Sequence, residues 1–387
     1  MVQVFIQYNC IPHYREPLFE TLCAQDDPKF TIICDDNSDT PYLKIISSDS
    51  SNIRQLKART FTFRLLKMPE FYWQPNSIKM FIVDQPDAMI VLSNPYSLTA
   101  WVILVLGKIL GKPVILWGHG LLSNETGPKW WIRRSFYKLA SGHLLYGHYA
   151  KKLLIDKGFT QNNLFVVYNS LNYLHQNQIF HNINKADQLK FKKTLDVKRN
   201  ERLVVFTGRL QPIKKLDLLV KALAILSNKK IRVHCALVGE GSQKQHLKEL
   251  ATRTGVSSLV HFLGEHYEEE YLGLVYKSSD LCVIPSGAGL TIMHSLVFGT
   301  PVLISNNTEK QFPEWEAVID NKTGFFFSDE NVEDMAEKIQ QIVFNKNTKS
   351  KMATSCRAII QEKYNPAIQA QVFNKAIEYF KLKGPYS

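Results

Sequence analysis

LCVIPSGAGLTIMHSLVFGTPVLISN, residues 281–306, contains the pattern from which the fold can be predicted. Its two apolar runs, LCVIP and PVLIS, are typical of buried parallel strands. The small residues of 286–289 form a turn between the first run and a helix predicted over 290–298, where apolar residues recur at helical spacing. The first N–H groups of a helix have no backbone partner, and the helix dipole favours negative charge there. The stretch therefore predicts an anion-binding turn, although an ordinary strand-to-helix turn would have the same pattern.

The same order of strand, turn and helix recurs along the whole chain. Further apolar runs that are typical of strands lie at 2–8, 30–34, 61–66, 88–93, 113–117, 143–146, 164–168, 203–206, 232–238 and 259–262. A chain of 387 residues is too long for one ordinary core and suits two domains. We therefore predict two Rossmann-like, doubly wound α/β domains that face each other across a cleft.

The predicted domain limits follow from composition. The N-terminal domain is expected over 1–180 and the C-terminal domain over 181–365. The polar stretch 169–202 is interpreted as the connection between them. A final helix over 366–387 is expected to cross back to the N-terminal domain.

The composition limits the class of partner and the compartment. The formal net charge is +12, which suggests an anionic partner such as nucleotide phosphates, lipid headgroups or nucleic acid. No nucleic-acid motif is present, so nucleic acid is not favoured. The six cysteines are scattered without a Cys-x-x-Cys pair, which indicates a reducing, cytoplasmic protein without a zinc site.

Two segments bear on membrane association. The apolar stretch 98–117 is interrupted by Lys108 and Lys112, so helix, turn and strand is the better interpretation than a membrane span. The N-terminus is predicted to be a first strand and not a signal peptide. The segment Lys129-Trp130-Trp131-Ile132-Arg133-Arg134 suggests contact with an anionic membrane, at the cytosolic face of the inner membrane. Alternatively, the tryptophans belong partly to the core and the cations are solvated.

Titratable residues follow two predicted strands of the N-terminal half. Pro12, His13 and Arg15 come soon after the first strand, and His119 lies between two glycines after the run 113–117. Open α/β sheets bind ligands at the carboxyl ends of their strands. These four residues are therefore candidates for ligand contacts in a cleft, with a solvated loop as the alternative for the first three. A neutral His119 could both donate and accept hydrogen bonds.

Two cations flank the turn after the strand 203–206. Arg209 and Lys214 combine a planar fork of donors with a point charge, next to the start of a predicted helix. This combination is suited to a diphosphate group.

With these turns in order, the chain resembles the retaining glycosyltransferases of the GT-B architecture, the family 4 type, also called glycosyl transferases group 1. The matching segments are TGRL (207–210) with Lys214, VGEG (238–241), VHFLG (260–264), SDLCVIPS (279–286), GLT (289–291), GTPV (299–302) and NKTGF (321–325). The resemblance implies that the nucleotide-sugar donor is bound by Gly208, Gly239, Glu240, Gly241, His261, Gly264, Ser286, Gly287, Ala288, Gly289, Leu290, Thr291 and His294. The N-terminal half matches mainly through IPHYRE (11–16) and WGHG (117–120).

The chain departs from this family at two positions. The family commonly carries paired glutamates, whereas this chain has Ser286 and His294 there. A branch with Gly-Leu-Thr-x-x-His is similar, so we interpret the chain as a variant. A neutral His294 near the positive end of the helix dipole is expected to bond the ribose hydroxyls, with a packing histidine as the alternative. Glu314 is a candidate for returning a carboxylate to the site.

The resemblance implies transfer of a sugar from a nucleotide sugar to a glycan or lipid-linked glycan with retention, as in the synthesis of lipopolysaccharide or capsule. Arg209 and Lys214 are then the groups that stabilise the leaving diphosphate, and His119 orients the sugar or the acceptor. No metal ion and no cofactor are expected. Two alternatives remain: a catalytically silent nucleotide-sugar-binding scaffold and a GT-B-fold sugar epimerase.

Overall fold

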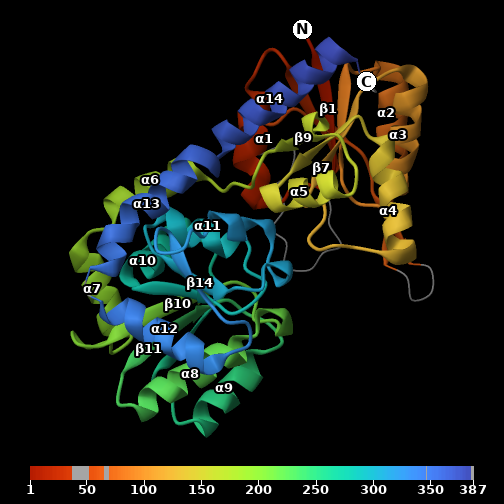
Figure 1. The fold of residues 1–387 in the computed structure, drawn as a ribbon. Coiled ribbons are helices and arrows are strands. Elements are labelled where there is room, and N and C mark those ends of the chain that lie inside the picture. Colours follow the sequence, from red (N-terminus) through yellow and green to blue (C-terminus); the bar gives the residue numbers. More distant parts are fainter. Residues whose placement is uncertain (37–51, 65–68, 346, 385–387) are drawn as a thin grey trace. The chain divides into compact units, whose positions relative to one another are not determined.

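The computed structural model describes residues 1–36, 52–64, 69–345 and 347–384, which form two compact units (Figure 1). Unit 1 comprises Met1–Leu171 together with the chain from Pro366 onward, and unit 2 comprises Asn172–Asn365. The predicted limit at 180 therefore lies inside unit 2. The reason is that the polar stretch 169–202, which we interpreted as a connection, contains two helices that pack on α10 (Glu269–Ser278) of unit 2. These helices are α6 (Tyr173–Asn182) and α7 (Lys185–Thr194).

Unit 1 has a parallel seven-stranded sheet in the order β3-β2-β1-β6-β7-β8-β9. Its strands are short and mostly buried on both faces, as expected for a parallel sheet covered by helices. Their bounds are β1 (Gln3–Cys10), β2 (Lys29–Asp35), β3 (Gln55–Lys57), β6 (Ala88–Leu92), β7 (Val114–Gly118), β8 (Gly142–Leu145) and β9 (Leu164–Val166).

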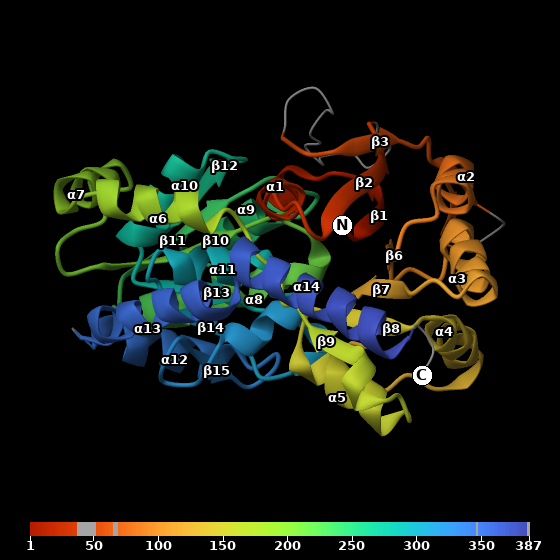
Figure 2. The ribbon, with the colours of Figure 1, turned by 90° about the horizontal axis from the view of Figure 1, so that it is seen from above.

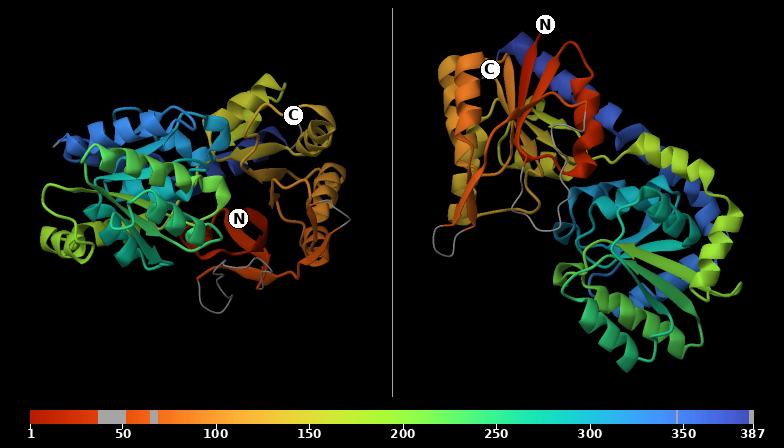
Figure 3. Two further views of the ribbon diagram at one scale, coloured as in Figure 1. Left: turned by 90° about the horizontal axis from the view of Figure 1, so that it is seen from below. Right: turned by 180° about the vertical axis from the view of Figure 1, so that it is seen from behind.

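Helices cover both faces of this sheet, as the views of Figures 1 and 3 show. One face packs on α1 (Glu16–Cys23) and α14 (Pro366–Lys383), with Phe19, Phe30 and Phe373 in the shared core. The other face packs on α2 (Pro75–Asp84), α3 (Leu98–Leu110), α4 (Gly127–Leu139) and α5 (His148–Asp156).

Helix α14 completes unit 1 from the far end of the chain. It packs beside α1, as Figure 2 shows with α14 in blue and α1 in red. Phe373 and Phe380 are buried in the core of unit 1. A Cβ on Gly142 of β8 would lie 2.4 Å from the Phe380 ring, so the helix and the sheet are in close contact.

Unit 2 has a parallel six-stranded sheet in the order β12-β11-β10-β13-β14-β15. The strands are β10 (Arg202–Thr207), β11 (Val233–Val238), β12 (Val260–Gly264), β13 (Leu281–Ile284), β14 (Val302–Ser305) and β15 (Gly324–Phe327). The helices that follow α7 are α8 (Leu216–Asn228), α9 (Lys244–Arg253), α10 (Glu269–Ser278), α11 (Leu290–Val297), α12 (Val332–Phe344) and α13 (Thr348–Lys363). The two doubly wound sheets predicted from the sequence are therefore confirmed.

A two-stranded antiparallel ribbon stands apart from the sheet of unit 1. It pairs β4 (Phe61–Arg64) with β5 (Glu70–Trp73). The strand predicted over 61–66 therefore exists but belongs to this ribbon, and residues 65 and 66 lie outside the described residues.

All six cysteines are buried as free thiols. Over the described ranges, no helix is both long enough and apolar enough to cross a bilayer.

Candidate functional site

The strand order of the sheet in unit 2 reverses between β10 and β13. From β10 the chain adds β11 and β12 on one side, then returns to add β13, β14 and β15 on the other. Open α/β sheets bind ligands outside the carboxyl ends of the strands at such a switch point. The turns after Thr207 and Ile284 meet there, and the Thr291 hydroxyl donates a 2.8 Å hydrogen bond to the Thr207 carbonyl. The sequence-predicted turns are thus brought together.

The turns after β10 and β11 are joined by backbone contacts. The Gly208 N–H donates to the Val238 carbonyl at 2.9 Å, and the Leu210 N–H donates to the Glu240 carbonyl at 2.8 Å. Gly239 has φ +139°, and a Cβ there would lie 2.1 Å from the Gly208 carbonyl oxygen. Only glycine fits such an approach, so the Gly-x-Gly pattern has a structural cause at this position.

Some N–H groups of the small-residue turn at 286–289 already donate hydrogen bonds within the protein. Gly287 donates to the Lys310 carbonyl at 3.2 Å, and Ala288 donates to the Gln311 side chain at 2.7 Å. Leu290 occupies the first position of α11, so its N–H and the next one have no partner four residues back. The N–H groups that could bind an anion are therefore those at the start of α11 rather than those of the whole turn.

Lys214 lies against this turn. Its Nζ donates to the Gly287 carbonyl at 2.5 Å and lies 5.5 Å from the centre of the Phe312 ring. Burial lowers the pKa of Lys214, Glu314 acts in the opposite direction, and Arg209 adds to the lowering. Glu314 is itself only 3% exposed. The two predicted cations and the predicted carboxylate are thus close enough to interact, and a bound anion would relieve the repulsion between the cations.

His294 has surroundings that the sequence did not indicate. It lies in the last turn of α11, away from the positive end of the dipole, so the predicted environment was wrong. Its Nδ1 lies 3.6 Å from a Glu269 carboxylate oxygen and 3.3 Å from Nε2 of Gln176, which donates to the same carboxylate at 3.0 Å. Sequence reasoning missed Glu269 and Gln176. An acidic residue at the first turn of α10 was the one local signal for Glu269.

His261 lies away from the switch-point edge. It is the second residue of β12, and its Nε2 is 2.9 Å from Nδ1 of His234, whose Nε2 is 2.9 Å from the Glu201 carboxylate. The predicted role of His261 in binding the nucleotide-sugar donor is therefore not supported by its position. Burial lowers the pKa of His261 to about 4, and the neighbouring His234 adds to this effect.

In unit 1 the structure exposes His119 at the carboxyl end of β7. Its ring lies 4.9 Å from that of Tyr146. A Cβ on the preceding Gly118 would lie 2.9 Å from the Ser93 Cβ, so the glycine allows β7 and the turn after β6 to approach closely. Pro12 precedes a short 3-10 helix that begins with the half-buried His13.

Arg15 is a buried structural cation and not a cleft residue. It is 3% exposed and donates to the Asn169 side chain at 2.5 Å and to the Tyr146 hydroxyl at 2.7 Å. The guanidinium carbon lies 5.1 Å from the centre of the Trp117 ring. The candidate role in contacting a ligand is therefore wrong, because aromatic and amide groups distant in sequence enclose the side chain.

The residues of the predicted membrane segment lie on different sides of helix α4, some buried and some exposed. Trp130 is 9% exposed and packs in the core of unit 1, so it does not belong to the surface. Trp131 and Ile132 are 68% and 58% exposed. Arg133 forms an ion pair with Glu125 at 3.1 Å.

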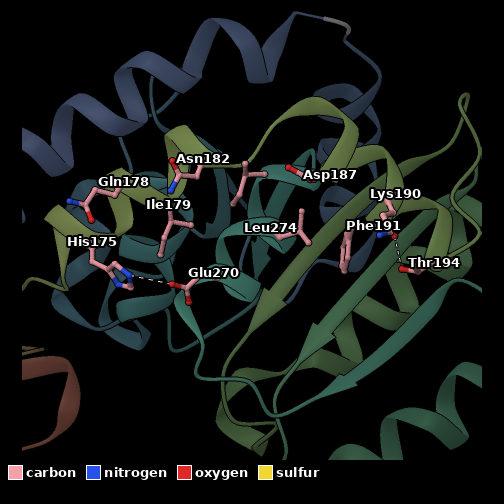
Figure 4. Close-up of a pocket in the computed structure, with 11 residues that line it drawn as sticks. His175, Gln178, Ile179, Asn182, Asp187, Lys190, Phe191, Thr194, Glu270 and Leu274 are labelled. Atoms are coloured by element: carbon pink, nitrogen blue, oxygen red, sulfur yellow. Dashed lines mark hydrogen bonds and ion pairs between the residues drawn. The ribbon is translucent and has the colours of Figure 1, made fainter.

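A cavity of about 480 Å³ lies elsewhere in unit 2, between α6, α7 and α10 (Figure 4). None of the sequence-predicted site residues lines it. The His175–Glu270 pair at 3.3 Å lies at one end, and Phe191 and Leu274 line the apolar part. Within the described ranges, no three His, Cys, Asp or Glu side chains gather as a metal site.

Comparison with known proteins addresses the part of the chain that holds the switch-point site. Residues 187–358 match the family model of glycosyl transferases group 1. The chain is 29% identical over 145 residues to an uncharacterized glycosyltransferase of Methanocaldococcus jannaschii. It is also 29% identical over 165 residues to the D-inositol 3-phosphate glycosyltransferase of Mycobacteroides abscessus. These alignments cover 36% and 42% of this chain, and each covers only 36% of the relative.

The similarity of folds extends further than that of sequences. The structure of Anabaena HepE in complex with UDP superposes with a TM-score of 0.74 at 17% identity, covering 98% of this chain and 100% of that chain. At this identity the likeness shows the fold alone. Residues 187–358 thus match glycosyl transferases group 1, and the chain has the two-domain α/β fold of GT-B glycosyltransferases.

Proposed function

We propose that the protein is a retaining glycosyltransferase that transfers a sugar from a nucleotide sugar to a glycan or lipid-linked glycan in surface polysaccharide synthesis. The observation that carries this proposal is Lys214 held against the turn that leads into α11, in the neighbourhood of Arg209 and within the residues that match the family. The UDP complex of HepE supports a nucleotide donor. Retention and the acceptor class rest on the resemblance of the motifs.

The proposed chemistry requires stabilisation of a departing diphosphate. Lys214 and Arg209 would neutralise its charge, and the open N–H groups of α11 would add hydrogen bonds. The leaving phosphate would accept the proton of the acceptor hydroxyl, so no protein nucleophile takes part. His119 would orient the transferred sugar or the acceptor. An unchanged transfer rate in His119→Ala would remove this last role.

The first test is thermal unfolding with UDP, GDP, ADP and their sugars. A ligand that binds only the folded protein at 100 times its Kd should add about 2.7 kcal/mol of stability. We expect one nucleotide to raise the Tm, with loss of the effect in Arg209→Ala and retention in Arg253→Ala, which alters the exposed end of α9.

The reaction is tested by following the mass of a glycan acceptor. Gain of one sugar unit would support transfer. Conversion of the nucleotide sugar without transfer would favour the epimerase. A nucleotide-induced Tm shift without any turnover would favour the silent scaffold.

Attachment to an anionic membrane stays part of the proposal, now through the exposed side of α4. Trp131 and Ile132 are flanked by exposed Lys129 and Lys138. Sedimentation with phosphatidylglycerol vesicles, compared with phosphatidylcholine vesicles, tests it. We expect Trp131→Ser/Ile132→Ser to lose binding to the anionic vesicles, and Ile109→Ser on α3, a residue that is also exposed, to retain it. Equal binding by both variants would contradict the role of α4.

A further inference from the structure

The β4–β5 ribbon of unit 1 carries an aromatic row on one face. Phe61 pairs with Trp73, and Phe63 pairs with Phe71 across the two strands. Directly opposed residues of an antiparallel pair point to the same side, and side chains alternate between sides along each strand. All four rings therefore share one face of the ribbon.

This aromatic face is accessible. Phe61 and Phe63 are 45% and 43% exposed, and neither Phe71 nor Trp73 is fully buried. The rings of Phe63 and Phe71 are stacked with their centres 5.7 Å apart and their planes 17° apart. Tyr96 closes the row with its ring edge-on, 5.9 Å from Phe71. Exposed aromatic groups gathered in this way indicate a binding surface.

The ribbon is fixed to the carboxyl edge of the sheet. Gln74, which follows β5, is 1% exposed and receives a 2.5 Å hydrogen bond from the Gln7 side chain of β1. Its amide donates to the Tyr8 carbonyl at 3.1 Å and to the Thr60 hydroxyl at 2.7 Å. Thr60, just before β4, donates its N–H to the Asp35 carboxylate at the end of β2 at 2.5 Å. A buried polar network that is bonded in this way holds its members rigidly.

The charges on the ribbon favour a neutral ligand. On the opposite face Arg64 lies 3.7 Å from Glu70, so the two strands carry no net charge. Arg59 lies over the Phe61 ring at 5.2 Å, which leaves a donor at the end of the row. An anionic bilayer would require an excess of cations, which the described residues of β4 and β5 lack. Sugar rings present polarised C–H bonds on one face and hydroxyls at their edge, which matches a negative aromatic face beside a donor.

We propose that the aromatic face of the β4–β5 ribbon binds the glycan acceptor, with its rings stacked on the C–H faces of pyranose units. This inference rests on the proposed function, because it assigns the acceptor side of the same reaction. The rigid attachment near the ends of β1 and β2 places the bound glycan at the ligand edge of unit 1.

Binding of neutral oligosaccharides to the full chain tests the proposal. The probes are maltotetraose, cellotetraose and tetra-N-acetylchitotetraose, followed by saturation-transfer NMR and calorimetry. We expect at least one to bind, and Phe63→Ala to weaken it about tenfold, the effect of one lost aromatic contact. Phe63→Tyr should retain binding, and Phe63→Leu, which keeps apolar area without a ring, should not. Ile109→Ala on α3, an exposed apolar residue outside the ribbon, is the control and should bind normally.

The outcomes separate this proposal from the proposed function. Absence of binding by all three probes, or equal binding by Phe63→Ala, would overturn the ribbon proposal. If Phe63→Ala instead lost binding to anionic vesicles, the ribbon would be a membrane surface and the proposal would be wrong. The nucleotide-induced Tm shift should be the same in every ribbon variant. Its absence in the unaltered protein would contradict the proposed function, whatever the oligosaccharides do.

Discussion

The carboxyl edges of the two sheets differ in whether backbone groups or side chains form them. In unit 2 the edge consists mainly of backbone: the turns at Gly208 and Gly239 touch, and the start of α11 supplies N–H groups, with Lys214 as the cation beside them. In unit 1 the edge consists mainly of side chains, with His119 after β7 and the aromatic ribbon anchored by Gln74.

Under the proposed function, this difference corresponds to a constant ligand in unit 2 and a variable one in unit 1. A diphosphate is common to UDP-, GDP- and ADP-sugars, so a fixed backbone cradle suits it. A surface of side chains can change by single substitutions while the sheet is kept. If this interpretation is correct, substitutions in unit 2 should act through backbone geometry and charge, and those in unit 1 through contact.

The largest effect is expected where backbones touch. Gly239→Ala places a Cβ against the Gly208 carbonyl and at a φ that L-residues rarely adopt, so we expect a loss of roughly 4 kcal/mol in the free energy of unfolding. Gly255→Ala has a positive φ but open space, and should cost only about 1 kcal/mol. Urea unfolding of both variants measures the difference. Equal losses would show that φ alone, and not the approach of the turns, requires glycine.

The next effect is on catalysis. Lys214→Met should remove about 3 kcal/mol of transition-state stabilisation and lower kcat/KM accordingly. This is the size of effect seen when a donor to a developing negative charge is lost. Lys221→Met, which removes an exposed cation on α8, should leave kcat/KM unchanged. Steady-state rates at several donor concentrations decide it. A loss confined to KM would mean that Lys214 binds the ground state equally well.

The stability of unit 1 is expected to depend on pH because its core contains a buried histidine. His143 is 3% exposed among the rings of Tyr137 and Phe159, and burial lowers its pKa to about 4. The unfolded chain protonates this residue near pH 6.5 and the folded chain does not, so stability is retained above pH 6.5 and falls as the pH drops toward 4.

The loss should be about 1.4 kcal/mol per pH unit within this window. His143→Phe should remove this part of the pH dependence. Unfolding free energies of both proteins at pH 7.5 and 5.5 measure it. If the stability difference between the two pH values were the same in His143→Phe as in the unaltered protein, a group other than His143 would take up the proton.

The smallest effect tests whether side chains matter in unit 2. Glu269→Gln removes the carboxylate beside His294 and should raise the KM for the donor about fivefold, the effect of one hydrogen bond of about 1 kcal/mol. Glu270→Gln, the next residue, contacts His175 instead and should leave the KM unchanged. If both variants behave alike, the Glu269–His294 pair is structural.

The predictability of the site follows the same division. The turns of unit 2 could be predicted because glycines and cations at fixed spacing produce them locally, and Lys214 does lie against the turn at Gly287. The surroundings of His294 could not, because Gln176 and Glu269 come from helices that are distant in sequence. Arg15 was misjudged for the same reason, since its partners Tyr146 and Asn169 lie far along the chain.

The fold was more predictable than its edges. Apolar runs predicted most strands of both sheets, because a buried parallel strand is apolar on both faces. The edge strands β3 and β15 were not predicted. The ribbon was harder, since a strand run at 61–66 does not reveal whether its partner lies in the main sheet. The helices over 173–194 were missed because their residues are largely polar and few of them are buried.

The position of α14 has a consequence for synthesis on the ribosome. Phe373 and Phe380 fill the core of unit 1, yet they are made only after the whole of unit 2. Unit 2, which is continuous from Asn172 to Asn365, can therefore complete its core before α14 is made. Unit 1 holds an open apolar face throughout that time, although domains generally fold in the order of their synthesis. The folding of unit 1 is therefore expected to finish after that of unit 2, once α14 has been made and packs on the open face.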